Sequence, residues 1–129
     1  MTRFLPLVAG CFLLAAASAQ AAPADREAEL ARALEGRVAG EPVDCIDLYR
    51  VRSSRVIPDT AIVYRAGGTL YVNRPRSGAE SLNRWDTLVT RTPTPRLCSV
   101  DPVQVVDMHS GMMTGLVMLG DFVPYRRVD

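Results

Sequence analysis

The residues best suited to acid–base chemistry gather around His109, the single histidine of this 129-residue chain. Ser110 follows it directly and offers a hydroxyl nucleophile, while Asp107 or the more distant Asp121 offers a carboxylate that would orient the imidazole. Residues two apart on a strand face the same side, so Asp107 can approach His109. A small hydrolase centred on His109 is therefore one hypothesis, although no G-x-S-x-G nucleophile elbow accompanies it.

Metal-ligating residues do not show the spacing of a known site. One histidine and two distant cysteines, Cys45 and Cys98, do not make a zinc pattern. Two acidic pairs could contribute to a calcium site, but neither lies in the twelve-residue loop typical of such sites: Asp44 with Asp47, and Asp101 with Asp107. No phosphate-binding glycine loop is present either. We expect no metal and no cofactor.

The most unusual local composition is a group of four methionines: Met108, Met112, Met113 and Met118. Thioethers are ligands for soft copper(I), and the glycines among these residues would let three of them converge. Methionine more commonly fills irregular gaps in a core or forms an adaptable contact surface. We interpret the group as packing and contact residues and keep copper(I) as the alternative.

The first 21 residues have the three parts of a secretory signal peptide. Arg3 supplies the basic start, residues 4–17 form an apolar core, and small residues follow up to Ala21. We predict cleavage before Ala22, with cleavage before Gln20 as the alternative. Because the apolar stretch is short for a membrane span, we predict a mature periplasmic or secreted protein without a membrane span.

Cys11 lies within this segment, and Val8-Ala9-Gly10-Cys11 matches the pattern before the acylated cysteine of bacterial lipoproteins. A lipoprotein signal places its apolar core ahead of the cysteine, whereas here the strongest apolar run, residues 12–17, follows it. The sequence therefore favours an ordinary signal peptide over lipid anchoring through Cys11.

Cys45 and Cys98 are the two cysteines that remain after removal of the signal. An even pair in an exported protein predicts a disulfide. The alternatives are a buried pair of free thiols and a two-thiolate metal site without its other ligands.

All 15 basic residues of the chain are arginines, balanced by 14 acidic residues. Without Arg3 the mature chain is formally neutral, which excludes the basic surface that nucleic-acid binding requires. The arginines fall into three local groups: Arg50, Arg52 and Arg55; Arg74 and Arg76; Arg126 and Arg127. We interpret these groups as the solvated face of a half-buried sheet, with a patch for anionic glycans or lipid head groups as the alternative.

One helix is predicted, over residues 24–38, because Asp25 can cap it and Leu30, Leu34 and Val38 recur at helical spacing. Its narrow apolar stripe predicts loose packing on the domain or a role as a spacer. Short strand-like segments follow, broken by turn residues: 45–51, 55–57, 61–65, 69–73, 85–92, 103–108 and 116–125. Ala66-Gly67-Gly68 is the strongest hairpin signal, and residues 109–115 are predicted as a loop.

These elements predict a mainly β fold, a small antiparallel barrel or sandwich with a short N-terminal helix. The predicted organisation is a signal peptide over residues 1–21, an N-terminal helix and linker over 22–40, and a β-rich domain over 41–129.

Several short segments between residues 45 and 125 match a known pattern: Cys45-Ile46, residues 52–59, residues 61–64, Tyr71 to Pro75, Leu97 to Asp101, and Leu119 to Pro124. Through them the chain resembles an uncharacterised family of small exported proteobacterial proteins, classed as a domain of unknown function. The resemblance implies a compact β-rich exported domain without an assigned activity. Members of that family carry two further cysteines, one near residues 77–80 and one at Val117 or Met118, and this chain has neither.

The leading interpretation is a non-enzymatic binding or interaction module whose partner is a periplasmic protein or an envelope component. Its β-face would present arginines and five aromatic residues: Tyr49, Tyr64, Tyr71, Trp85 and Tyr125. The alternative is the hydrolase centred on His109. The two hypotheses differ in whether the imidazole reaches both a serine hydroxyl and a carboxylate within a cleft.

Overall fold

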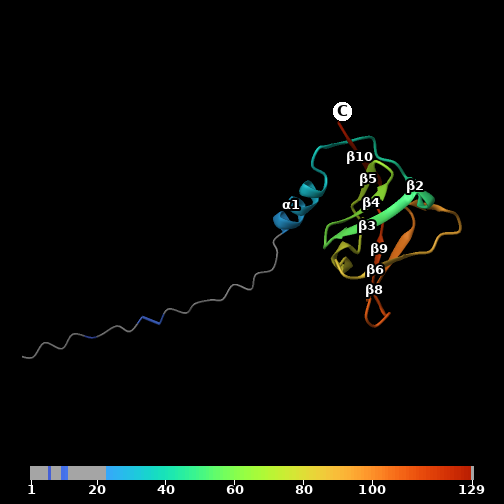
Figure 1. Cartoon of the computed structure of the whole chain (residues 1–129). Coiled ribbons are helices and arrows are strands. Elements are labelled where there is room, and N and C mark those ends of the chain that lie inside the picture. Colours follow the sequence, from blue (N-terminus) through green and yellow to red (C-terminus); the bar gives the residue numbers. More distant parts are fainter. Residues whose placement is uncertain (1–5, 7–9, 12–22, 129) are drawn as a thin grey trace, which may run out of the picture.

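The computed structural model describes residues 6, 10, 11 and 23–128 (Figure 1). The predicted signal peptide and both candidate cleavage sites therefore lie almost entirely outside the described residues. Cys11 is among the described residues and is an exposed free thiol. No helix within the described ranges is long and apolar enough to cross a membrane.

Short strands make up most of the described chain, with one α-helix near its start. The elements are α1 (Pro23–Ala33), β1 (Arg37–Ala39), β2 (Cys45–Asp47), the 3₁₀ turn η1 (Leu48–Arg50), β3 (Val51–Ile57), β4 (Ala61–Ala66), β5 (Thr69–Asn73), the 3₁₀ turn η2 (Ala79–Ser81), β6 (Thr87–Thr90), β7 (Arg96–Cys98), β8 (Pro102–Val106), β9 (Met113–Met118) and β10 (Phe122–Arg127).

The strands form three antiparallel sheets rather than a closed barrel. A five-stranded sheet has the order β1-β10-β5-β4-β3, a three-stranded sheet the order β6-β8-β9, and β2 pairs with β7 alone. Figure 1 shows α1 beside the large sheet. The labels β6, β8 and β9 lie together at the lower end of the domain, away from the C-terminus. The predicted mainly β fold with a short N-terminal helix is confirmed, and it is the sandwich form.

The middle of the five-stranded sheet is buried on both faces, because both sets of alternating side chains along β4 are apolar, whereas most of the outer strands β3 and β1 is exposed. Ile62 and Tyr64 point into the larger core, which the two smaller sheets close and which contains Phe122. Ala61 and Val63 point into a second core, whose other members include residues of β5 and one turn of α1.

Leu30 closes this second core from α1 and is 2% exposed. The helix is therefore a covering layer of the sheet, held by one fully buried leucine and by the half-buried Leu34. The predicted helix is too long at its C-terminal end: α1 ends at Ala33, and Gly36 at φ 74° turns the chain. Val38 is not on the helix but in β1, where it pairs with Arg126 and is exposed.

The predicted hairpin at residues 66–68 is confirmed, since Ala66 pairs with Thr69 across Gly67 and Gly68. The predicted strand over residues 45–51 is wrong in its second half. Asp47 accepts a hydrogen bond from the backbone N–H of Tyr49 at 2.9 Å and stops β2 with a 3₁₀ turn. The short strands β1 and β7 were not expected from the sequence. The predicted loop over residues 109–115 ends early, because β9 begins at Met113.

The chain leaves the three-stranded sheet and enters the five-stranded sheet at Gly120, and a buried amide holds this crossing. The side chain of Asn73, fully buried, donates to the carbonyl of Gly120 at 2.7 Å and accepts from its N–H at 2.9 Å. A Cβ at position 120 would collide with the carbonyl oxygen of Arg74, so the backbone approach requires glycine. The Asn73 side chain thereby provides hydrogen-bond partners for the N–H and the carbonyl of Gly120, which lies between β9 and β10 and outside the backbone ladders of both sheets.

Cys45 and Cys98 form the predicted disulfide, which is confirmed. They lie directly opposite each other in β2 and β7, while Ile46 and Leu97 on the other face of this ribbon are buried in the larger core. A two-stranded ribbon is marginally stable by itself. The bridge, together with the burial of Ile46 and Leu97, keeps it on the core.

Replacing both bridging cysteines, as Cys45→Ser with Cys98→Ser, should lower the free energy of unfolding by up to about 4 kcal/mol, because the bridge closes a 53-residue separation in the unfolded chain. Urea denaturation of the oxidised protein and of the double variant measures the difference. Under reducing conditions the two proteins should unfold alike, and a difference that persists with a reductant would contradict this account.

Asn73→Ala should lower the free energy of unfolding by about 2–4 kcal/mol, because it leaves the N–H and the carbonyl of Gly120 buried without partners. Tyr64→Phe is the matched control: the Tyr64 hydroxyl is equally buried in the larger core but has no hydrogen-bond partner among the described residues. Removal of that hydroxyl should leave stability unchanged or slightly raised. Equal effects of the two substitutions in urea denaturation would refute the role of the Asn73 amide.

Candidate binding site

His109 lies in an exposed turn between β8 and β9 and not in a cleft. The carboxylate of Asp107 accepts hydrogen bonds from the backbone N–H groups of His109, at 2.7 Å, and Ser110, at 3.3 Å. The Ser110 hydroxyl accepts from the N–H of Met112 at 3.2 Å. Within residues 23–128 no hydroxyl or carboxylate hydrogen-bonds to the imidazole. Asp107 and Ser110 shape a turn, and this arrangement does not support the hydrolase hypothesis.

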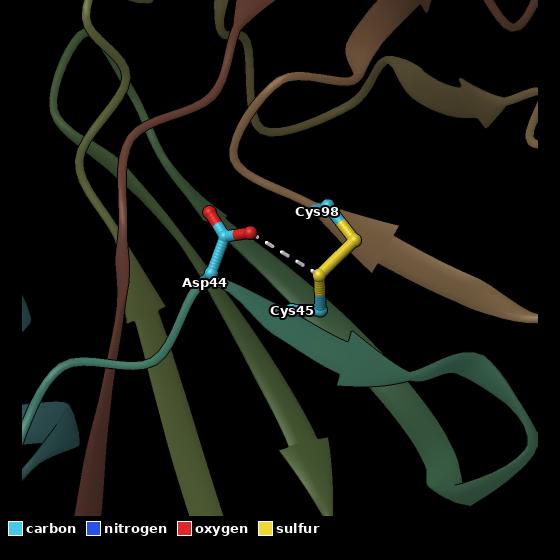
Figure 2. A group of neighbouring side chains, drawn as sticks. All are labelled: Asp44, Cys45 and Cys98. Carbon is cyan, nitrogen blue, oxygen red and sulfur yellow. Dashed lines mark hydrogen bonds between the residues drawn. A yellow bond between two sulfur atoms is a disulfide. The ribbon is translucent and has the colours of Figure 1, made fainter.

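The described residues bring one group of metal-ligating side chains together: Asp44, Cys45 and Cys98. Figure 2 shows the Asp44 carboxylate beside the disulfide, with an oxygen 3.5 Å from the sulfur of Cys45. A bridged sulfur carries no hydrogen, so this approach is a contact and not a hydrogen bond. The hydroxyl of Ser99 donates to the other Asp44 oxygen. Without thiolates the group offers a single carboxylate, which is too few ligands for a metal.

The other carboxylates considered for calcium serve local turns. Asp47 caps η1, and Asp101 accepts from the N–H of Cys98 at 2.8 Å. Neither joins a group of three potential ligands in the described part of the chain.

The methionine group is split between surface and interior. Met108, Met112 and Met113 are exposed around the β8–β9 turn, whereas Met118 is half-buried at the other end of β9, where it bridges to Ser77. The copper(I) alternative asked for three converging thioethers, and it stays a prediction for the three methionines of this turn, without Met118.

The aromatic residues expected on one face are distributed over the molecule. Tyr64 is buried, and its ring lies 5.9 Å from that of Phe122. Burial raises the pKa of its hydroxyl. Tyr71 and Tyr125 pack against different cores. Only Tyr49 and Trp85 are largely exposed, at 84% and 70%. Trp85 is the one that lies beside a groove.

This groove, hereafter the Trp85 groove, has two parts that share Arg84 and Asp86. The main part, of about 580 Å³, is an open hollow bounded by Arg26 of α1, by Asp59 of the β3–β4 turn, by Thr114 of β9 and by the loop of residues 80–86. Asp107 adds a further carboxylate at its far wall.

The second part of the groove, of about 450 Å³, runs between residues 54–56 of β3 and Thr87 and Leu88 of β6. These are the outer strands of the two larger sheets. The Trp85 groove thus lies where the edge strands of the two larger sheets, β3 and β6, are not paired with each other.

The loop that carries Trp85 is anchored at its start by close backbone packing against β9. The N–H of Met118 donates to the carbonyl of Ser77 at 3.0 Å. Gly78 has a φ of 83°, and a Cβ on it would collide with the carbonyl oxygen of Leu116. A Cβ on Gly115 would likewise collide with the side chain of Ser81. Two glycines therefore allow this loop to lie directly on β9.

Further along, Leu82 anchors the loop in the larger core, where it is 2% exposed. The next four residues form a tight turn in which the N–H of Asp86 donates to the carbonyl of Asn83 at 3.2 Å. The Asn83 side chain accepts from the N–H of Trp85 at 3.4 Å. The indole therefore projects to solvent from a turn whose ends are fixed.

The side chains on both sides of Trp85 are also tethered. The hydroxyl of Thr114 on β9 lies 3.4 Å from the Asp86 carboxylate and 3.3 Å from the carbonyl of Val105, so its one proton is shared between these two acceptors. Arg84 forms an ion pair of 2.9 Å with Glu29 of α1. The turn that presents the indole is thus connected to the sheet on one side and to the helix on the other.

Glu29 is the centre of this helix contact. Its carboxylate also lies 3.5 Å from the guanidinium of Arg55 and 3.9 Å from that of Arg26, and its side chain is 12% exposed. Partial burial raises the pKa of Glu29, but the hydrogen bonds and charges of Arg84 and Arg55 outweigh it, so the net pKa is lowered. A second pair, Glu27 with Arg74 at 2.7 Å, lies at the surface.

The charges that line the main part of the groove are mixed, with an excess of carboxylates. Asp59, Glu80, Asp86 and Asp107 face two arginines, Arg26 and Arg84. Since Arg84 is already paired with Glu29, the groove does not offer a strongly positive surface.

Sequence reasoning named Trp85 only as one aromatic of five and did not identify the acidic residues around it. The available signal was local: Leu82-Asn83-Arg84-Trp85-Asp86 places the only tryptophan of the chain among polar turn residues. A tryptophan in such a turn cannot be buried without burying its polar neighbours.

Comparisons of the chain with protein-family models, with curated proteins and with solved structures found no match in any of the three. The resemblance of the chain to a family of unknown function therefore stays a prediction from its sequence segments.

Glu29→Gln should lower the free energy of unfolding by about 0.5–1 kcal/mol near neutral pH. Because the folded-state pKa is lowered, the contribution of Glu29 is fully present above its ordinary value of 4.5 and is lost as the pH falls through the folded-state value. Thermal unfolding between pH 7 and pH 3 should therefore show the two proteins converging in acid.

Glu35→Gln is the control for this measurement, because Glu35 is the second residue after the end of the helix and forms no ion pair among the described residues. It should unfold like the unsubstituted protein at every pH. A difference between Glu29→Gln and the unsubstituted protein that stays constant down to pH 3 would contradict the assignment.

Proposed function

We propose that this protein is a non-enzymatic binding module of the bacterial periplasm, and that the Trp85 groove is its binding site. The disulfide between Cys45 and Cys98 is compatible with an oxidising compartment. The N-terminal sequence, with its basic start, apolar core and small-residue end, supports export. The partner is a periplasmic protein or a component of the cell envelope.

The observation that carries the proposal is the exposure of Trp85 at 70% on a rigidly built turn beside a groove. A solvent-exposed indole leaves a large apolar surface in water, and tryptophan is enriched among residues that dominate binding energy. The ion pair of Arg84 with Glu29 and the contact of Asp86 with Thr114 hold the turn that carries the ring before binding, which lowers the entropy that the turn loses on association.

A photo-reactive amino acid at Thr87, on the exposed rim of the groove, tests the proposal in intact cells. Illumination should give a crosslinked product, and Trp85→Ala should reduce its yield at least about tenfold because the main anchor is lost. Mass spectrometry identifies the product.

Tyr49→Ala is the matched control, since Tyr49 is an even more exposed aromatic residue outside both parts of the groove. It should leave the crosslink yield unchanged. A product whose yield is the same in Trp85→Ala and Tyr49→Ala would place the binding site elsewhere and refute the proposal.

A further inference from the structure

From the chemistry of the groove we infer that its ligand is a neutral glycan, with a sugar ring stacked on Trp85. The inference rests on the proposed binding function and adds the class of ligand. It is drawn from the indole, from the mixed hydrogen-bonding groups beside it and from the charge of the lining.

A pyranose ring presents a flat face of C–H groups, which carry a weak positive charge. The indole face carries the negative part of the ring quadrupole and offers the largest flat apolar surface of any side chain. Trp85 is exposed at the edge of an open groove and not enclosed in a pocket. This placement suits a chain of linked rings, of which one stacks while its neighbours continue along the groove.

The polar groups around the indole include both donors and acceptors. Asp59, Glu80 and Asp86 offer carboxylate oxygens, and Arg26 and Asn83 offer N–H donors. The Nε atom of Arg26 is buried and has no partner among the described residues. A sugar hydroxyl both donates and accepts, so it matches such a mixed lining, whereas a lysine or arginine side chain of a peptide partner only donates.

The distribution of charge argues against a polyanion. Four carboxylates line the main part of the groove, and Glu29 already engages Arg55 and Arg84. An anionic ligand would meet these four carboxylates and would have to compete with Glu29 for Arg55 and Arg84. A neutral polyol avoids both costs, because each carboxylate can accept hydroxyl donors without a change in net charge.

The groove also has room for more than one ring. Its two parts, of about 580 Å³ and about 450 Å³, share Arg84 and Asp86, and their linings extend from the β3–β4 turn to β3 and β6. The outer strands β3 and β6 line the second part, so their unpaired backbone groups add further donors and acceptors.

Titration of the oxidised protein with neutral tetrasaccharides of N-acetylglucosamine, glucose or mannose tests the inference. Trp85 is the single tryptophan of the chain, so its fluorescence reports directly on a ring stacked upon it. We expect a saturable change in emission for at least one tetrasaccharide, with a dissociation constant below about 1 mM. Calorimetry then compares variants, and Trp85→Ala should weaken binding at least tenfold.

Asp86→Asn keeps the size of the side chain and removes its charge, and it should weaken binding severalfold because a charged acceptor is lost. Tyr49→Ala should bind like the unsubstituted protein. Tetralysine, a sulfated tetrasaccharide and a neutral peptide serve as probes of the other ligand classes and should leave the emission of Trp85 unchanged.

The inference is overturned if no neutral tetrasaccharide changes the fluorescence or gives heat, or if one of the charged or peptide probes binds in their place. Either result would leave the proposed function standing if the crosslink at Thr87 still depended on Trp85 and joined a protein. If the yield of the Thr87 crosslink did not depend on Trp85, the proposed binding site itself would be refuted. The two failures are therefore distinguishable.

Discussion

The reciprocal hydrogen bonds between the Asn73 side chain and the Gly120 backbone determine how the two layers of this protein meet. The chain can pass from β9 to β10 through the interior only if the peptide group at the crossing is satisfied there. Gly120 allows the backbone to approach Arg74, and Phe122 directly after it fills the larger core. The positions of β9 and β10, and hence of everything that packs on them, depend on this crossing.

The β2–β7 ribbon and the helix α1 are both held in place by contacts with other parts of the fold. The β2–β7 ribbon is held by its disulfide and by two apolar residues inserted in the larger core. The helix α1 is held by Leu30 and by the ion pairs of Glu29 with Arg55 and Arg84. Because Arg84 belongs to the turn that carries Trp85, the contact that fixes the helix also fixes one wall of the groove. Stability and the candidate site are thus coupled through one carboxylate.

Much of the fold could be predicted from the sequence because the signals were local. The Ala66-Gly67-Gly68 hairpin and the turn-separated strands follow from residue types and short spacing. The disulfide followed from the cysteine count, since two cysteines remain beyond the predicted signal. The C-terminal end of α1 could not be predicted, because the helical spacing of apolar residues continues past Gly36, where the chain turns. The end of β2 could not be predicted either, because the alternating pattern continues past Asp47, whose side chain caps a 3₁₀ turn. The strands β1 and β7 have three residues each and acquire their pairing from distant partners, so no local pattern marks them.

The order of residues alone was enough to predict a nearly neutral, β-rich chain with one pair of bridging cysteines, because these predictions need only composition and periodicity over a few residues. The assembly of the groove needed the folded chain. Arg26, Asp59, Trp85 and Thr114 come from four separate elements and meet only when the two sheets and α1 pack together. In the folded chain Asp107 and Ser110 accept hydrogen bonds from backbone N–H groups of the turn and not from the His109 imidazole, and Tyr64 is buried. Long-range contacts of this kind depend on which faces are buried, and that is a property of the whole packed molecule.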